Sequence, residues 1–307
     1  MDSGCLNVQL HGSDSGGVSR RRLLQLSALA AAGTVTLSSP AAAASGPPAI
    51  FYSPHQDDEA IGMAGTILEH KAAGRPVYLV LVTRGENDGL RQIMDEGACT
   101  TLGSRCSAPG HSHALGWAAG GDEVVLGRTA EFYASAKAIG VDKVINFALP
   151  DNAYGDGDGA AGTPVYDRFV RDIAARVGQL ADRYPGASHK FAAGWLDGNP
   201  THKACSDAAY SLRDRLPDLR FNYIYSYQQH PVDDRVQGAD LVLDIPDADM
   251  ARKRAAILAY NTWDPARDLY TLGYHSVPEW LEQASADPRE FIHVLPADYR
   301  PGKPTGG

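Results

Sequence analysis

The stretch AIFYSPHQDDEAIGMAGTILEHKAAGRPVYLVLV, residues 49–82, decides the fold of this chain. An apolar run at 49–53 is followed by a helical pattern at 60–73 and by an almost continuous apolar run at 77–82. Continuous apolar runs are typical of strands whose two faces are both covered, and Gly74 suits the end of the helix between them. The stretch therefore predicts a strand, a helix and a second, parallel strand of an α/β sheet.

The remaining sequence continues this alternation. Further helices are expected at 129–139, 166–184, 201–216 and 248–260, and further strands at 143–149, 191–195 and 222–227. We therefore expect a single Rossmann-like α/β domain with a mainly parallel sheet flanked by helices. Two glycine-rich stretches, 86–127 and 151–164, interrupt the pattern. We expect them to be surface loops near the carboxyl ends of strands, where ligands bind in open sheets.

The composition narrows the class of protein. With 44% hydrophobic and 21% charged residues, the 307-residue chain is typical of a globular protein with a core. The net charge of -9 argues against binding to nucleic acid. After residue 45 no apolar run is long enough to span a bilayer, so we expect no stable membrane insertion. The sequence does not indicate an oligomeric state.

The first 45 residues have the pattern of an export signal. The basic segment SRRR at 19–22 precedes a stretch rich in leucine and alanine, and small residues follow at 38–44. This arrangement predicts a twin-arginine signal peptide at 1–45, a folded domain at 46–307 and a secreted, extracellular location. The alternative is a disordered N-terminus of low complexity.

Export bears on the cysteines, because an oxidising compartment favours disulfides. Cys99 and Cys106 bracket a short, turn-prone segment, and we expect them to be joined. Cys205 is expected to remain a free thiol on a helix. The chain has no Cys-x-x-Cys spacing of the kind that indicates a zinc ion held by sulfur.

The segment His55-Gln56-Asp57-Asp58-Glu59 lies where the first predicted strand ends and the first helix begins. A divalent cation would offset the mutual repulsion of its three carboxylates. His55 and Asp58 are three residues apart across the turn, so both can face one ion, while Asp57 projects differently and could hold a water beside it. Helix capping is the alternative, since aspartates favour a first helical turn, but capping does not explain His55.

A third ligand is expected from the segment Asp197–Lys203. It has the same layout, with a strand, a short polar turn and then His202 in the first turn of a helix. Two histidines and one aspartate with a vacant position are typical of catalytic zinc. We therefore expect one Zn2+ per chain, bound by His55, Asp58 and His202.

Further motifs follow in order along the chain. They are TRGE at 83–86, RTAE at 128–131, LPD at 149–151, PTH at 200–202 and KRAAIL at 253–258. Together with the 55–59 segment, this ordered set resembles the PIG-L (LmbE-like) family of N-acetylglucosaminyl deacetylases over residues 47–265.

The resemblance implies a metal-dependent N-deacetylase, a hydrolase acting on linear amides. Its substrate would be an N-acetylated amino sugar or a glycoconjugate that carries one. Asp57 would be the general base acting on the zinc-bound water, and Arg128 and Asp151 would hold sugar hydroxyls. Glu59 is interpreted as a support for the start of the helix.

The chain departs from the family pattern at two positions. Gln56 stands where the commoner form has proline, and Asn199 stands where many members carry a histidine that could stabilise the oxyanion. That role is left open among Asn199, Arg84, His230 and His275.

The segment 86–127 is also longer than compact family members need. With a disulfide inside it, we expect an ordered lid or a substrate-recognition loop. His111 and His113 within it are interpreted as solvated loop residues, and a second metal site is the alternative.

Two other functions remain open at this point. One is a secreted glycan-binding protein that keeps the fold without turnover, and the other is an amidase acting on a different acyl-amine. A binding protein needs no general base, so the presence of Asp57 favours an enzyme.

Overall fold

The computed structural model describes residues 46–95, 97, 99, 102–117, 121–151, 162–196, 199–224 and 238–302. The chain separates into a segment Met1–Ala41 and a compact unit Ala42–Gly307, and the description concerns the second. The predicted signal peptide, most of the 151–164 loop and His230 lie outside the described residues. Among the described helices, none has the length and apolar character needed to cross a membrane.

A seven-stranded sheet forms the centre of the described unit, in the order β3-β2-β1-β4-β5-β9-β6. Its strands are β1 (Ala49–Ser53), β2 (Val77–Thr83), β3 (Lys143–Leu149), β4 (Ser188–Ala192), β5 (Leu219–Asn222), β6 (Leu241–Asp244) and β9 (Arg289–His293). The pairs from β3 through β5 are parallel, and β9 runs antiparallel to both β5 and β6. The prediction of a single α/β domain with a mainly parallel sheet is confirmed.

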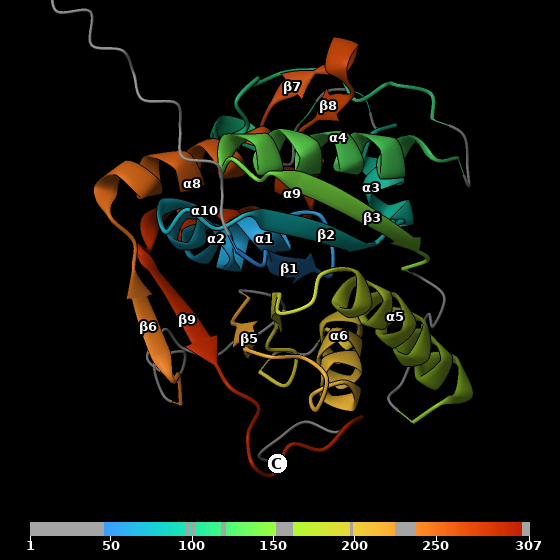
Figure 1. Ribbon diagram of the computed structural model, residues 1–307. Coiled ribbons are helices and arrows are strands. Elements are labelled where there is room, and N and C mark those ends of the chain that lie inside the picture. The colour runs from blue at the N-terminus through green and yellow to red at the C-terminus, as the bar shows by residue number, and fades with distance from the viewer. Residues whose placement is uncertain are drawn as a thin grey trace, which may run out of the picture. The chain divides into compact units, whose positions relative to one another are not determined.

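Helices cover both faces of this sheet (Figure 1). One face carries α1 (Asp58–Gly62), α2 (Ala64–Ala72), α4 (Glu123–Ala138), α8 (Asp247–Ala259) and α10 (Pro278–Ala286), and the other carries α5 (Pro164–Arg183) and α6 (Pro200–Ser211). Because side chains on both faces are covered, all five residues of β1 are buried. The two apolar clusters on either side of the sheet form the core.

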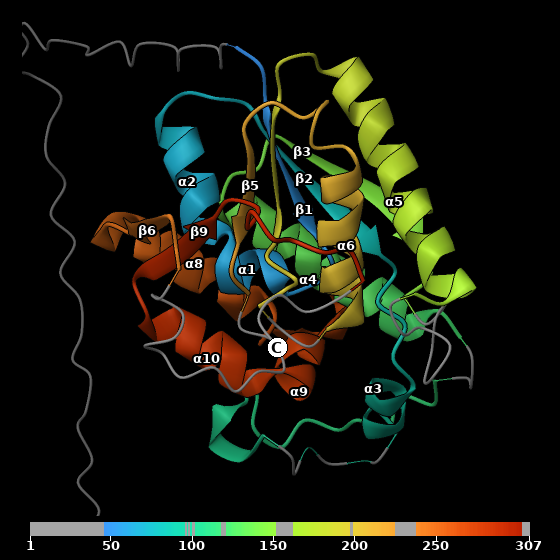
Figure 2. The same ribbon diagram turned by 90° about the horizontal axis from the view of Figure 1, so that it is seen from below.

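The long segment between β2 and β3 is ordered over its described residues. It contains α3 (Asp88–Ile93) and a 3-10 turn (Gly103–Arg105), and it lies alongside α9 (Leu272–Ser276) and α10 (Figure 2). Arg105 forms ion pairs with Glu279 (3.0 Å) and Glu282 (2.8 Å) of α10. These contacts fasten the segment to the C-terminal part of the chain. A short hairpin of β7 (Trp263–Asp264) and β8 (Leu269–Tyr270), joined by a 3-10 turn (Pro265–Arg267), precedes α9.

Two strands begin earlier than the sequence predicted. The strand expected at 191–195 is β4, which begins at residue 188. The strand expected at 222–227 is β5, which begins at residue 219. The start of β4 is polar, but its polar side chains have partners: the Tyr52 hydroxyl lies 2.9 Å from Nδ1 of His189, and Lys190 donates to Asp218 over 3.0 Å. Such partners allow a polar segment to lie inside a sheet, and local sequence does not reveal them.

Two helices also differ from their predicted bounds. The helix expected at 60–73 is divided at Met63 into α1 and α2, and α4 begins at Glu123 rather than at 129. The first residues of α4 therefore occupy the end of the predicted 86–127 insertion.

Candidate metal centre and active site

The candidate site lies at the carboxyl ends of the two central strands, β1 and β4. The connection after β1 passes through α1 and α2 on one face of the sheet, whereas the connection after β4 passes through α6 on the other face. Adjacent parallel strands whose connections diverge in this way leave a crevice at their carboxyl ends. The turn between β1 and α1 carries His55, Asp57 and Asp58, and the start of α6 carries His202. The topology therefore brings together the two segments that the sequence predicted to form the site.

Three ligand atoms form a nearly equilateral triangle in this crevice. His55 Nδ1 lies 3.2 Å from Asp58 Oδ2 and 3.2 Å from His202 Nε2, and His202 Nε2 lies 3.1 Å from Asp58 Oδ2. A tetrahedral zinc ion with bonds of about 2.0–2.2 Å separates its ligand atoms by about 3.3–3.6 Å. The three side chains therefore fit three corners of such a site, and the fourth corner is left for water or substrate.

Asp151 holds the imidazole of His55 from the opposite side. Its Oδ1 atom lies 3.1 Å from His55 Nε2 and also accepts a hydrogen bond from the Thr201 hydroxyl over 3.1 Å. A carboxylate behind a metal-ligating histidine fixes the ring and its tautomer. Burial lowers the pKa of His55, but the Asp151 and Asp58 carboxylates outweigh burial and raise it to about 9. The sugar contact expected of Asp151 stays a prediction.

Asp57 occupies a strained backbone position. Its φ of 105° lies in the region that L-residues rarely adopt, and such strain persists only where the surroundings enforce it. The Asp57 amide donates to the Tyr260 hydroxyl over 3.0 Å, and that hydroxyl donates to Glu59 over 2.6 Å. Ser135 donates to the same Glu59 oxygen over 2.6 Å. Glu59 therefore supports the turn, as the sequence indicated.

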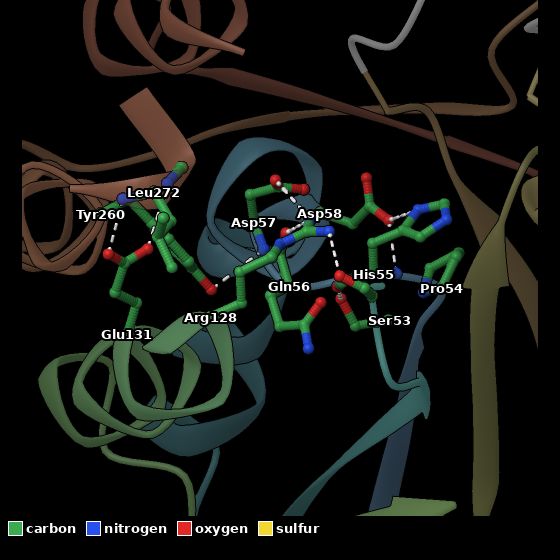
Figure 3. Close-up of polar contacts among 12 residues, drawn as sticks. Ser53, Pro54, His55, Gln56, Asp57, Asp58, Arg128, Glu131, Tyr260 and Leu272 are labelled. Atoms are coloured by element: carbon green, nitrogen blue, oxygen red, sulfur yellow. Dashed lines mark hydrogen bonds and ion pairs between the residues drawn. The ribbon is translucent and has the colours of Figure 1, made fainter. Parts of the chain in front are cut away.

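Arg128, from α4, binds the same turn from its other side (Figure 3). Its guanidinium donates to the carbonyls of Gly85 and Gln56, each over 3.0 Å, and lies 3.3 Å from Asp57 Oδ2. A Cβ atom at Gly85 would lie 2.9 Å from this guanidinium and 2.0 Å from the Gln56 side chain, so glycine is required there. Arg128 thus orients Asp57, and its predicted contact with a sugar stays a prediction.

The two neighbouring aspartates have opposite electrostatics. Burial raises the pKa of Asp57 to about 7, although Arg128 opposes the shift. Burial also acts to raise the pKa of Asp58, but His202 and His55 outweigh it and hold that pKa below its usual range. Asp58 is therefore suited to bind a cation as a permanent carboxylate. Asp57 is suited to exchange a proton near neutral pH.

Comparison with protein families decides the affiliation of the chain. The family model PIG-L, described as GlcNAc-PI de-N-acetylase, matches residues 50–212, which is more than half of the chain and includes both halves of the site. The chain belongs to the PIG-L family. Its enzyme class is accordingly that of a metal-dependent N-deacetylase. No curated protein sequence matches the chain.

Solved structures share the fold of this PIG-L family chain. A deacetylase–teicoplanin complex from teicoplanin biosynthesis has 16% identity and a TM-score of 0.54, covering 80% of this chain and 96% of that chain. The conserved protein TT1542 from Thermus thermophilus has 21% identity and a TM-score of 0.50, covering 83% and 98%. At these identities the likeness establishes the fold alone.

The other predicted site residues of this PIG-L family chain have local partners. Arg84 pairs with Asp122 and lies 3.5 Å from Glu86. Asn199 caps α6, because its side-chain oxygen accepts from the amide of Thr201 over 2.8 Å. The role of oxyanion stabiliser therefore stays open for Arg84 and Asn199.

His275, the third candidate for that role among the described residues, lies in a separate cluster. Its Nε2 atom is 3.4 Å from Cys99 Sγ, and its ring packs against that of His113 with 4.6 Å between the ring centroids. His113 is only 1% exposed. The interpretation of His113 as a solvated loop residue is therefore wrong.

The predicted disulfide between Cys99 and Cys106 is not formed, because both are free thiols. Each sulfur faces a histidine instead: Cys99 lies beside His275, and Cys106 Sγ lies 3.3 Å from His111 Nδ1. Cys205 is a buried free thiol on α6, as expected.

The supporting roles of several residues around the site were not predicted from the sequence. Tyr260 and Ser135 support the Asp57 turn, and Gln56 donates to the Arg84 carbonyl over 2.8 Å. The Glu131 carboxylate accepts hydrogen bonds from the backbone amides of Leu272 (2.7 Å) and Gly273, and these bonds connect α4 to the start of α9 (Figure 3). The sequence marked Glu131 only as the last residue of the RTAE motif at 128–131 and assigned it no role.

Proposed function

We propose that this chain is an exported, zinc-dependent hydrolase that removes the acetyl group from an N-acetylated amino sugar of the N-acetylglucosamine type, or from a glycoconjugate that carries one. The observation that carries the proposal is the carboxylate of Asp57, which stands beside the triangle of His55, Asp58 and His202 without being part of it. The family description, GlcNAc-PI de-N-acetylase, supports this substrate class.

The donor set fits zinc. Two imidazole nitrogens and one carboxylate oxygen with an open position form a common catalytic zinc site. When bound there, Zn2+ would lower the pKa of a water to about 7 and polarise the amide carbonyl.

Asp57 performs the proton transfers of the proposed reaction. It accepts a proton from the water that attacks the amide carbon, and it delivers that proton to the amine nitrogen as the C–N bond breaks. The products are acetate and the free amino sugar. The buried contacts of Arg128 and Tyr260 hold Asp57 in one orientation, so no reorganisation is needed during the reaction.

Acetate release tests the proposal. The purified protein would be assayed with N-acetylglucosamine, N,N'-diacetylchitobiose and a larger N-acetylated glycoconjugate, with N-acetyl-lysine as a substrate that lacks a sugar. We expect release from at least one sugar, loss with a chelator and recovery with Zn2+. Release from N-acetyl-lysine alone would favour the amidase instead, and binding of a sugar without release would favour a glycan-binding protein.

The export part of the proposal is supported by the arginine-rich segment at 19–22 and the apolar stretch after it. Expression in a bacterium with a twin-arginine pathway tests it. We expect the protein in the medium, cleaved near residue 45. Replacement of the three arginines by lysine should retain it in the cell, and unchanged export of that variant would contradict the proposal.

A further inference from the structure

A second group of metal-ligating side chains lies outside the candidate active site. It consists of Cys99, His111, His113 and His275, whose ligand atoms all lie within 4.8 Å of one another. Three of these residues belong to the segment between β2 and β3, and His275 belongs to α9. We propose that the four side chains bind a structural zinc ion that fastens this segment to α9.

Two of the histidines are held in the tautomer that a metal requires. His111 Nδ1 lies 2.8 Å from the carbonyl oxygen of Ala108, and His275 Nδ1 lies 2.8 Å from that of Thr271. A carbonyl oxygen only accepts hydrogen bonds, so each Nδ1 atom carries the proton. The lone pairs are then on the Nε2 atoms, which face the cluster. This is the usual arrangement of histidines that bind metals.

The separations within the cluster are close to those of a tetrahedral site. Cys99 Sγ lies 3.4 Å from His275 Nε2, and zinc bonds of about 2.3 Å to sulfur and 2.0–2.1 Å to nitrogen place such atoms about 3.5 Å apart. The Nε2 atoms of His111 and His113 are 2.7 Å apart, so zinc would separate them by about 0.6 Å more. Trp263 stacks on the His111 ring at 3.8 Å between centroids and fixes its plane.

The donor chemistry distinguishes this cluster from the active site. Three imidazoles and one thiol form a complete set of four nitrogen and sulfur donors, as in structural zinc sites. The active site offers three donors and an open position. Cys99 binds as the thiolate, so its proton is released to solvent when the ion enters. A nitrogen and sulfur set also disfavours Ca2+ and Mg2+, which prefer oxygen.

The location connects the cluster to the support of the active site. The start of α9 is bound to Glu131 through the amides of Leu272 and Gly273, and Glu131 lies one turn from Arg128 on α4. A zinc ion on His275 therefore joins the β2–β3 segment to α9, whose first residues are bound to α4, the helix that carries Arg128. Its loss should loosen the segment and leave the ligands of the active site in place.

Metal analysis of the full chain tests the proposal. We expect two zinc ions per chain in the wild type, one in Cys99→Ser and one in His202→Ala. Cys205→Ser, which removes a buried thiol on α6, and Cys106→Ser, which removes the neighbouring thiol, should each retain two. A wild type with a single ion that Cys99→Ser retains, or two ions in Cys99→Ser, would overturn the proposal.

Cobalt substitution of the wild type gives a readout that does not depend on the stability of a variant. A thiolate bound to Co2+ produces a charge-transfer band in the near ultraviolet. We expect this band in the wild type and in His202→Ala, and its loss in Cys99→Ser and in His275→Ala. The absence of the band from Co2+-loaded wild type, or a Cys99–Cys106 disulfide found by mass spectrometry of the exported protein, would contradict the site.

Discussion

Arg128 and Asp57 form a buried ion pair, with 3.3 Å between the guanidinium Nη2 and the carboxylate Oδ2. Arg128 is 5% exposed, as is Asp57, so water screens the pair little. The guanidinium also donates to two backbone carbonyls of the surrounding turns. The proposed general base is thus held in place by a cation that opposes the rise of its pKa on burial.

The pair predicts how activity depends on pH. Removing the cation in Arg128→Gln should raise the pKa of Asp57 above its value in the wild type, because the opposing effect of Arg128 is lost. A general base acts deprotonated, so the acid limb of the profile of kcat/KM against pH should move to higher pH. Arg128→Lys keeps the charge and should shift this limb less. An acid limb that stays in place in Arg128→Gln would show that Asp57 does not control it.

The two aspartates should respond differently to the same substitution. Asp57→Asn removes the proton acceptor but no ligand, so turnover should fall by about 10²–10⁴-fold while the ion of the active site is retained. Asp58→Asn should lose that ion together with the activity. Acetate release and metal analysis on both variants check this. Near-normal turnover in Asp57→Asn would mean that the roles are reversed.

Asp151 should affect metal affinity through His55. Asp151→Asn removes the charge behind the imidazole and should weaken binding to the active site by about 10–100-fold. Competition with a zinc chelator measures this affinity. Asp182→Asn is the matched control, because Asp182 is an exposed partner of Arg215. Equal affinity in Asp151→Asn and the control would leave Asp151 with no role in holding His55.

Tyr260→Phe tests the support of the strained turn. The change removes the hydroxyl that accepts a hydrogen bond from the Asp57 amide and donates one to Glu59. The buried Asp57 amide then lacks the hydroxyl as an acceptor. The free energy of unfolding should fall by about 1–3 kcal/mol in denaturant titrations. Tyr133→Phe, at a tyrosine that is 47% exposed, is the control and should change it little. A Tyr260→Phe variant as stable as this control would show that the Tyr260 hydroxyl does not stabilise the Asp57 turn.

The sequence by itself determined the strand-turn-helix unit that carries His55, Asp57 and Asp58. Its apolar runs and its acidic turn are local features, and the strand and helix periods are encoded within a few neighbouring residues. The same layout located His202, and the topological rule for parallel strands placed both turns at one edge of the sheet.

Only the tertiary structure decided the partners of these residues. Arg128, Asp151 and Tyr260 are 71, 96 and 203 positions from the active-site residues that they contact. Whether Cys99 meets Cys106 or His275 likewise depends on how the β2–β3 segment packs against α9. Contacts between distant positions arise from packing of whole elements, which local periodicity does not encode. The sequence therefore determined which residues form the candidate site, and the packing determined what orients each of them.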